Sequence, residues 1–195
     1  MTCVAFAMTA AYTDRTADGV ELSPEFTYWG CKRIDMLPPR DGTTLDAALT
    51  VLSRIGYPPE ADWVYDEATD SAAPDYRPTL QACRAAWARR VGYGPFFPPT
   101  SQELIPILNG GDCAVLGVAL FETWHHAGSD GRILMPSLQM AELGGHAVVV
   151  VGYRPEAAGT EFVVKNSWGA GWGDHGYGYL PAGYIDVYGL VACRL

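Results

Sequence analysis

The sequence is poor in positive charge and in long apolar runs. Lysine and arginine number 13 against 22 aspartate and glutamate residues, so the formal net charge is −9. A chain of that sign is a poor partner for nucleic acid or an anionic membrane surface, and we expect neither. No apolar run approaches the roughly 20 residues that a membrane-spanning helix needs.

Paired cysteines are also missing. The chain has five cysteines and no Cys-x-x-Cys pair, the spacing typical of zinc sites and redox motifs. His125 and His126 are adjacent and therefore point to different sides of the chain, which makes them poor joint metal ligands. We expect no metal and no cofactor, and reduced thiols. The location stays open: the cysteine pattern favours the cytoplasm, but the abrupt start is either genuine or that of a fragment, so the absence of a signal peptide does not decide it.

Apolar residues make up 49% of the 195 residues, enough for one compact unit or two small lobes that share a cleft. Two helix starts are marked by capping residues, Ser23 followed by a proline and Thr100 in a Thr-Ser-Gln-Glu capping box. A further helix is predicted to start within residues 41–44, because apolar residues follow at helical spacing, and another over residues 79–90. Residues 113–121 are predicted to form a buried strand by their length and composition.

One stretch organises the rest of the chain. Residues 144–153 run Gly-Gly-His-Ala-Val-Val-Val-Val-Gly-Tyr, which predicts a buried strand with His146 at its mouth. Residues 161–165 predict the pairing strand, and Asn166 follows it directly. An imidazole and an amide on neighbouring strands are the base and the orienting group of a nucleophilic triad.

The start of the chain offers the third member of such a triad. Cys3 opens a nearly continuous apolar stretch to Tyr12, which predicts a buried helix with Thr2 as its N-cap. The helix N-terminus carries a partial positive charge, and this favours a thiolate there. On its own, Cys3 would be read as a small buried residue.

These three segments together resemble the papain-like cysteine peptidases. In that family the cysteine lies in a Cys-x-Ala-Phe-Ala context, the histidine in Gly-His-Ala-Val and the asparagine in Asn-Ser-Trp-Gly, all of which this chain has. His146 and Asn166 follow Cys3 by about 140 and about 160 residues, against an expected 130–150. The resemblance is to the bacterial-type members, which lack a cysteine before the nucleophile.

The resemblance implies an α+β fold with two lobes and an active-site cleft between them. A helical lobe over residues 1–95 would carry Cys3. An antiparallel β-barrel-like lobe over residues 96–185 would carry His146 and Asn166, and residues 186–195 would form a C-terminal strand that packs back across the lobes.

The resemblance also implies roles for residues around the triad. Trp168 would cover the hydrogen bond between Asn166 and His146, and Trp172 would lie on the leaving-group side. Asp41 and Gly42 are the nearest match to the segment that binds substrate as an extra strand, and Gly145 is a further substrate-binding candidate. Family members also have a glutamine that donates to the oxyanion from about six residues before the cysteine. That position does not exist here. Either an upstream segment or a partner chain completes the oxyanion hole, or the start is genuine, the hole is incomplete and the activity is weakened.

The expected activity is hydrolysis of peptide bonds in a peptide or protein substrate by a thiol peptidase. Two alternatives stay open. The first is an acyl-transfer variant of the ligase type, because fold and triad do not decide whether water or an amine reaches the thioester. The second is a catalytically impaired domain that binds peptides or acts as a scaffold.

Overall fold

The computed structural model divides the chain into two compact units, residues 1–93 and 94–195. The described residues are 2–16, 18–38, 42–68, 70, 73, 75–90, 92, 94–157 and 159–194.

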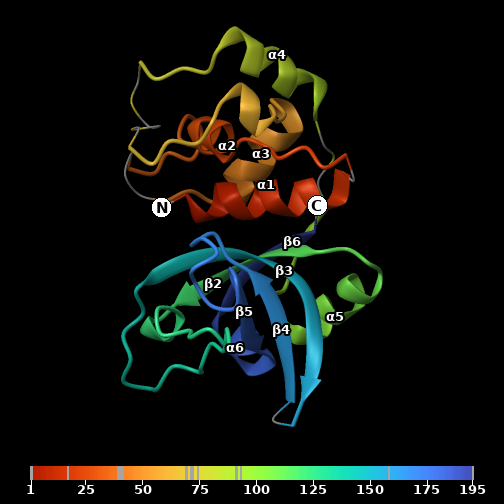
Figure 1. Cartoon of the computed structure of the whole chain (residues 1–195), viewed down its shortest axis with the longest axis vertical. Helices are drawn as coiled ribbons and strands as arrows, with labels where there is room; N and C mark the ends of the chain where they lie inside the picture. The colour runs from red at the N-terminus through yellow and green to blue at the C-terminus, as the bar shows by residue number, and fades with distance from the viewer. Residues whose placement is uncertain are drawn as a thin grey trace. The chain divides into compact units, whose positions relative to one another are not determined.

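The described part of the first unit is helical (Figure 1). Helices α1, α2 and α3 pack against one another through fully buried side chains such as Met8, Phe26 and Leu52. A short 3₁₀ turn, η1, lies in the otherwise irregular crossing before α4. The elements are α1 (Cys3–Thr16), α2 (Pro24–Cys31), α3 (Leu45–Arg54), η1 (Glu60–Asp62) and α4 (Leu80–Ala88).

Side-chain caps start four of the helices, and two of these caps, Ser23 and Thr100, were predicted from the sequence. In each case a hydroxyl oxygen accepts a hydrogen bond from the N–H three residues further on, at 3.1 to 3.3 Å. This bond satisfies one of the N–H groups that a helix start leaves without a partner. The capping residues are Ser23, Thr44, Thr79 and Thr100.

Gly56 shows why the first unit needs a glycine after α3. Its φ is +101°, a conformation that other residues rarely adopt. A Cβ atom there would lie 1.9 Å from the carbonyl oxygen of Ala86 in α4. Only glycine therefore allows the end of α3 to meet α4 this closely.

The second unit is a six-stranded sheet with two helices (Figure 1). The strand order is β1-β6-β2-β3-β4-β5, and every named pair is antiparallel. The sheet is open, with β1 and β5 at its edges. Its elements are β1 (Phe96–Phe97), α5 (Ser101–Asn109), β2 (Ala114–Leu120), η2 (Glu122–Trp124), β3 (Gly144–Glu156), β4 (Gly159–Lys165), β5 (Tyr177–Pro181), α6 (Ala182–Tyr188) and β6 (Gly189–Arg194).

One core joins the sheet to its helices. It combines side chains of β2, β3, β4 and β5, such as Leu116, Val150, Phe162 and Leu180, with Tyr184 of α6. The three strands predicted from residues 113–121, 144–153 and 161–165 are present as β2, β3 and β4. Helices on an antiparallel sheet give the α+β class that the sequence predicts.

Four elements of this unit were not predicted, namely β1, η2, β5 and α6. Residues 182–188 form α6, a short helix directly after β5, which the apolar pattern did not reveal. Within the predicted C-terminal segment 186–195, the strand β6 therefore begins only at Gly189. β5 itself is rich in glycine and aromatic residues, and it was read as part of an aromatic stretch instead of a strand.

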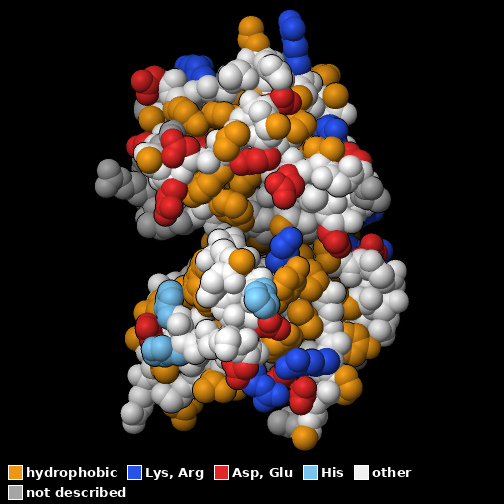
Figure 2. Space-filling model, viewed as in Figure 1, with side chains coloured by type: hydrophobic (Ala, Val, Ile, Leu, Met, Phe, Trp, Pro, Cys, Tyr) orange, Lys and Arg blue, Asp and Glu red, His pale blue; other side chains and the backbone are white. Residues whose placement is uncertain are grey.

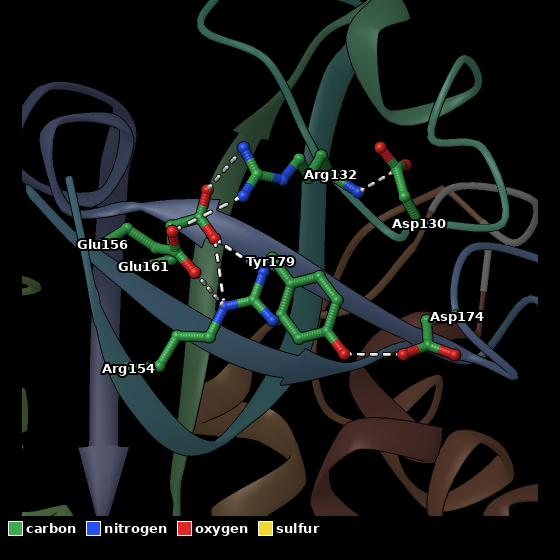
Figure 3. A network of polar contacts seen from close by, with 7 residues as sticks. All are labelled: Asp130, Arg132, Arg154, Glu156, Glu161, Asp174 and Tyr179. Carbon is green, nitrogen blue, oxygen red and sulfur yellow. Dashed lines mark hydrogen bonds and ion pairs between the residues drawn. The ribbon is translucent and has the colours of Figure 1, made fainter. Parts of the chain in front are cut away.

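A network of charged side chains ties β3, β4 and β5 together (Figure 3). Arg154 of β3 binds Glu161 of β4 at 2.8 Å, and its guanidinium lies 3.7 Å from the ring centre of Tyr179 on β5. Tyr179 donates to Asp174 at 2.6 Å, and this bond raises the pKa of the tyrosine. Arg132 reaches the same strands, because its Nη1 lies 4.0 Å from Glu161. In space-filling view, basic and acidic side chains meet over this unit, while acidic groups are spread over both units (Figure 2).

Among the described residues, no helix combines the length and apolar character needed to cross a membrane.

Candidate catalytic site

His146 lies at the start of the most buried stretch of β3. It pairs with Val118 of β2, and only 5% of its surface is exposed. Two glycines precede it, and Gly144 has a φ of +138°. The turn is thus followed at once by the apolar run that buries the strand, and the imidazole enters the core with it.

Asn166 directly follows β4 and faces His146. Its Oδ1 lies 2.8 Å from Nε2 of His146 and accepts a second bond, also 2.8 Å, from the backbone N–H of Ser167. The Ser167 bond fixes which end of the amide is oxygen, because an N–H needs an acceptor. Nε2 of His146 must therefore carry a hydrogen and donate it. In the neutral ring this leaves Nδ1 as the basic nitrogen.

Burial disfavours the protonated form of this imidazole. Desolvation lowers the pKa of His146 to about 4, although the hydrogen bond to Asn166 acts in the opposite direction. The ring centroids of Trp168 and Trp124 lie 5.0 Å and 5.4 Å from that of the imidazole. A neutral histidine with one fixed tautomer is suited to accept a proton.

Two tryptophans, Trp124 and Trp168, lie against the imidazole, and Trp172 packs against both of them. Trp172 stacks on Trp124 at 6.1 Å and donates from Nε1 to its carbonyl oxygen at 2.8 Å. Trp124 is fully buried and donates to the hydroxyl of Tyr184, which donates in turn to the carbonyl of Ala119. Trp168 and Trp172 were predicted beside the site. Trp124 and Tyr184 were missed, because nothing in their sequence context links them to His146.

Gly178 of β5 is packed so closely that a methyl group does not fit. A Cβ there would lie 2.7 Å from the indole of Trp172 and 2.9 Å from Ile133. We expect Gly178→Ala to lower the free energy of unfolding by about 1–3 kcal/mol, as overpacked cores do, and to displace Trp172. Gly183 in α6 has open space around its Cα, so Gly183→Ala is the matched control and should be neutral or slightly stabilising. Urea unfolding of both variants measures the difference, and equal midpoints would contradict this account.

Cys3 is the first residue of α1 and is partly exposed. The carbonyl of Thr2 accepts from the N–H of Phe6 at 3.1 Å, as at a helix start. By contrast, burial raises the pKa of both Cys31 and Cys193 to about 12, so those thiols are unreactive. Cys3 belongs to the first unit, and His146 and Asn166 belong to the second. Of the three, the structure brings His146 and Asn166 together.

The candidates for substrate binding are less defined. Asp41 lies outside the described residues. The carbonyl of Gly42 accepts a hydrogen bond from Lys32 at 3.1 Å. Gly145 is exposed beside His146, and a Cβ there would meet only Leu190, at 3.8 Å. An open backbone next to the imidazole leaves room for a ligand chain.

No group of three or more potential metal ligands is found within the described residues. His126 lies 4.0 Å from Glu122, and His175 is in an exposed turn with a φ of +53°. His125 is different, since its ring stacks on Trp168 at 4.8 Å with the planes 5° apart.

Comparison with known proteins gives matches at the level of sequence. Residues 118–192 match the papain family cysteine proteases, a range that includes His146 and Asn166. The chain is 29% identical over 153 residues to an uncharacterised peptidase C1-like protein of Acanthamoeba polyphaga mimivirus, covering 74% of this chain and 48% of that protein. It is 31% identical over 113 residues to Peptidase 1 of Dermatophagoides pteronyssinus, covering 55% of this chain and 34% of that protein. The chain thus spans about half or less of these relatives.

Solved structures share the fold. Xylellain, a cysteine protease from Xylella fastidiosa, superposes with a TM-score of 0.85 at 24% identity, covering 99% of this chain and 78% of that one. The digestive procathepsin L 3 of Tenebrio molitor larval midgut has a TM-score of 0.72 at 20% identity, covering 99% and 62%.

Proposed function

Because the chain belongs to the papain-like family of cysteine peptidases, we propose that it cleaves peptide bonds through a thioester intermediate. Cys3 is the nucleophile in this proposal, His146 the general base and acid, and Asn166 the residue that orients the imidazole. The hydrogen bond of 2.8 Å between His146 and Asn166 carries the proposal, because it leaves Nδ1 as the proton acceptor.

The chemistry needs two steps. The Cys3 thiolate attacks the carbonyl carbon of the peptide, and a C–S bond replaces the C–N bond as protonated His146 gives its Nδ1 proton to the departing amine. A water molecule then attacks the thioester, and His146 accepts a proton from it while the thiolate leaves. Asn166 holds the ring throughout, because its amide oxygen can only accept from Nε2.

The burial of His146 places a demand on this mechanism. A ring whose pKa is lowered to about 4 does not hold a proton at neutral pH unless a negative charge stabilises it. The Cys3 thiolate supplies that charge in our proposal, and the helix N-terminus stabilises the thiolate. In the ion pair, the negative thiolate would raise the pKa of the imidazole, and the positive imidazolium would lower the pKa of the thiol.

The first test is selective alkylation. Brief treatment with iodoacetamide at mildly acidic pH should give one adduct per chain, at Cys3, because ordinary thiols are protonated there and react slowly. The adduct should disappear in Cys3→Ala and fall strongly in His146→Ala, since the latter removes the imidazolium. Intact mass followed by peptide mapping measures both.

Cys83 serves as the control thiol, since it is exposed and lies in α4. Cys83→Ala should leave the adduct unchanged. Equal labelling of Cys3 and Cys83 in the native protein would reject an activated Cys3, and the reading as a peptide-binding or scaffold domain would then replace the enzyme. If Cys3 is labelled and peptides are cleaved, an added amine tests for acyl transfer. Formation of the corresponding amide product would show that an amine can replace water in the attack on the thioester.

A further inference from the structure

The contact between His125 and Trp168 is an aromatic contact that the proposed mechanism does not use. The ring of His125 stacks face to face on Trp168, with centroids 4.8 Å apart and planes 5° apart. Trp168 in turn lies 5.0 Å from the ring of His146. We propose that His125 is a positioning residue that holds Trp168 over the hydrogen bond between His146 and Asn166.

The anchoring of His125 makes it suited to this task. It follows η2, and its backbone N–H donates to the carbonyl of Glu122 at 3.0 Å. The residue before it, Trp124, is fully buried and hydrogen-bonded to Tyr184. The backbone at His125 is therefore attached to the core, while its side chain lies on the surface. A ring fixed in this way can restrain a partner.

Trp168 needs such a restraint because of its place in the chain. It lies after the end of β4, next to Gly169, whose φ is +82°. Its contacts with Trp124 and Trp172 are edge to face, with planes 65° and 82° apart. Among the described residues, the stack with His125 is the ring contact that covers a face of this indole in parallel.

The function of the Trp168 cover would be to exclude water from the side-chain amide of Asn166. The Nδ2 atom of Asn166 is buried and has no hydrogen-bond partner among the described residues. A buried donor without a partner is satisfied when water enters. Water that reached this amide would also compete for its Oδ1, and the imidazole would lose its fixed tautomer. A restrained Trp168 would therefore exclude water and preserve the hydrogen bond between Asn166 and His146.

This inference rests on the proposed function for its catalytic consequence, but its structural readout is independent of it. The readout is solvent exchange of the Nε2–H proton of His146, followed by NMR. In His125→Ala we expect exchange to be about tenfold faster than in the native chain. The kcat for a peptide substrate should fall several-fold, with KM nearly unchanged, since the imidazole and not the substrate contacts are disturbed.

Two further variants make the test specific. His125→Phe keeps the flat ring and should restore both the slow exchange and kcat, because stacking is retained. His126→Ala is the matched control: its ring faces Glu122, so exchange and kcat should stay at the native values. Side chains at both positions are exposed, and thermal unfolding verifies that each variant is folded.

The outcomes separate the two proposals. Unchanged exchange in His125→Ala, or no recovery in His125→Phe, overturns the positioning role whatever the activity. If the native chain cleaves no peptide while exchange follows the expected order, the positioning role stands and the proposed function fails.

Discussion

Peptide hydrolysis is expected to fall by roughly 10⁴- to 10⁶-fold when either Cys3 or His146 is replaced by alanine. Cys3→Ala removes the atom that forms the thioester, and His146→Ala removes the proton carrier for both steps. Because the two side chains act as one unit, the double variant should be no slower than the slower single variant. Measurement of kcat/KM for all three variants against the native chain decides this.

Additivity would contradict the proposed mechanism. If the double variant lost the product of the two single effects, the residues would contribute independently, and Cys3 and His146 would not belong to one catalytic unit. Cys83→Ala should keep native activity, because that thiol lies on the surface of α4.

The second large effect concerns protonation of His146. In Cys3→Ala, the pKa of His146 should be about 4, the value that burial gives it. In the native chain it should be higher, because the Cys3 thiolate of the proposed ion pair would stabilise the imidazolium. NMR titration of the ring measures both values. Equal values in the two proteins would mean that no ion pair forms.

The stability of Cys3→Ala should then depend on pH in a defined window. The folded pKa of about 4 is below the ordinary 6.5 of histidine, so the unfolded chain binds more protons between these values. Stability therefore decreases as pH falls from 6.5 to 4, by about 3 kcal/mol in total, and changes no further from this group below pH 4. In Cys3→Ala/His146→Ala this contribution should be gone, which urea unfolding at several pH values can show.

Local signals in the sequence predicted most of the elements. Hydroxyl caps located two helix starts, at Ser23 and Thr100, because a cap works through a bond three residues away and leaves a local pattern. The valine run of β3 and the shorter apolar run of β4 likewise predicted strands. His146 and Asn166 could be proposed as partners because each lies at the end of a predicted strand that pairs with the other.

Contacts between distant residues were not predictable in this way. The link from Trp124 to Tyr184 spans 60 positions, and neither residue has a neighbour pattern that reveals the other. The stacking of His125 on Trp168 was missed for the same reason, and adjacent histidines were read only as poor metal ligands. The short helix α6 has seven residues, which is too few for a helical period to stand out.

The strand order has a consequence for how the second unit is made during synthesis. β6 lies between β1 and β2 in the sheet, yet it follows every other strand along the chain. Until β6 has left the ribosome, β2 has an open edge, and β1 has no partner in the sheet. In the nascent sheet the backbone N–H and C=O groups along the open edge of the apolar strand β2 are therefore unpaired. Such an edge favours association with other chains. Ribosome-bound chains can be stalled at different lengths to test this. Chaperone binding should persist while the residues outside the tunnel end before Gly189, and it should decrease once Arg194 is also outside.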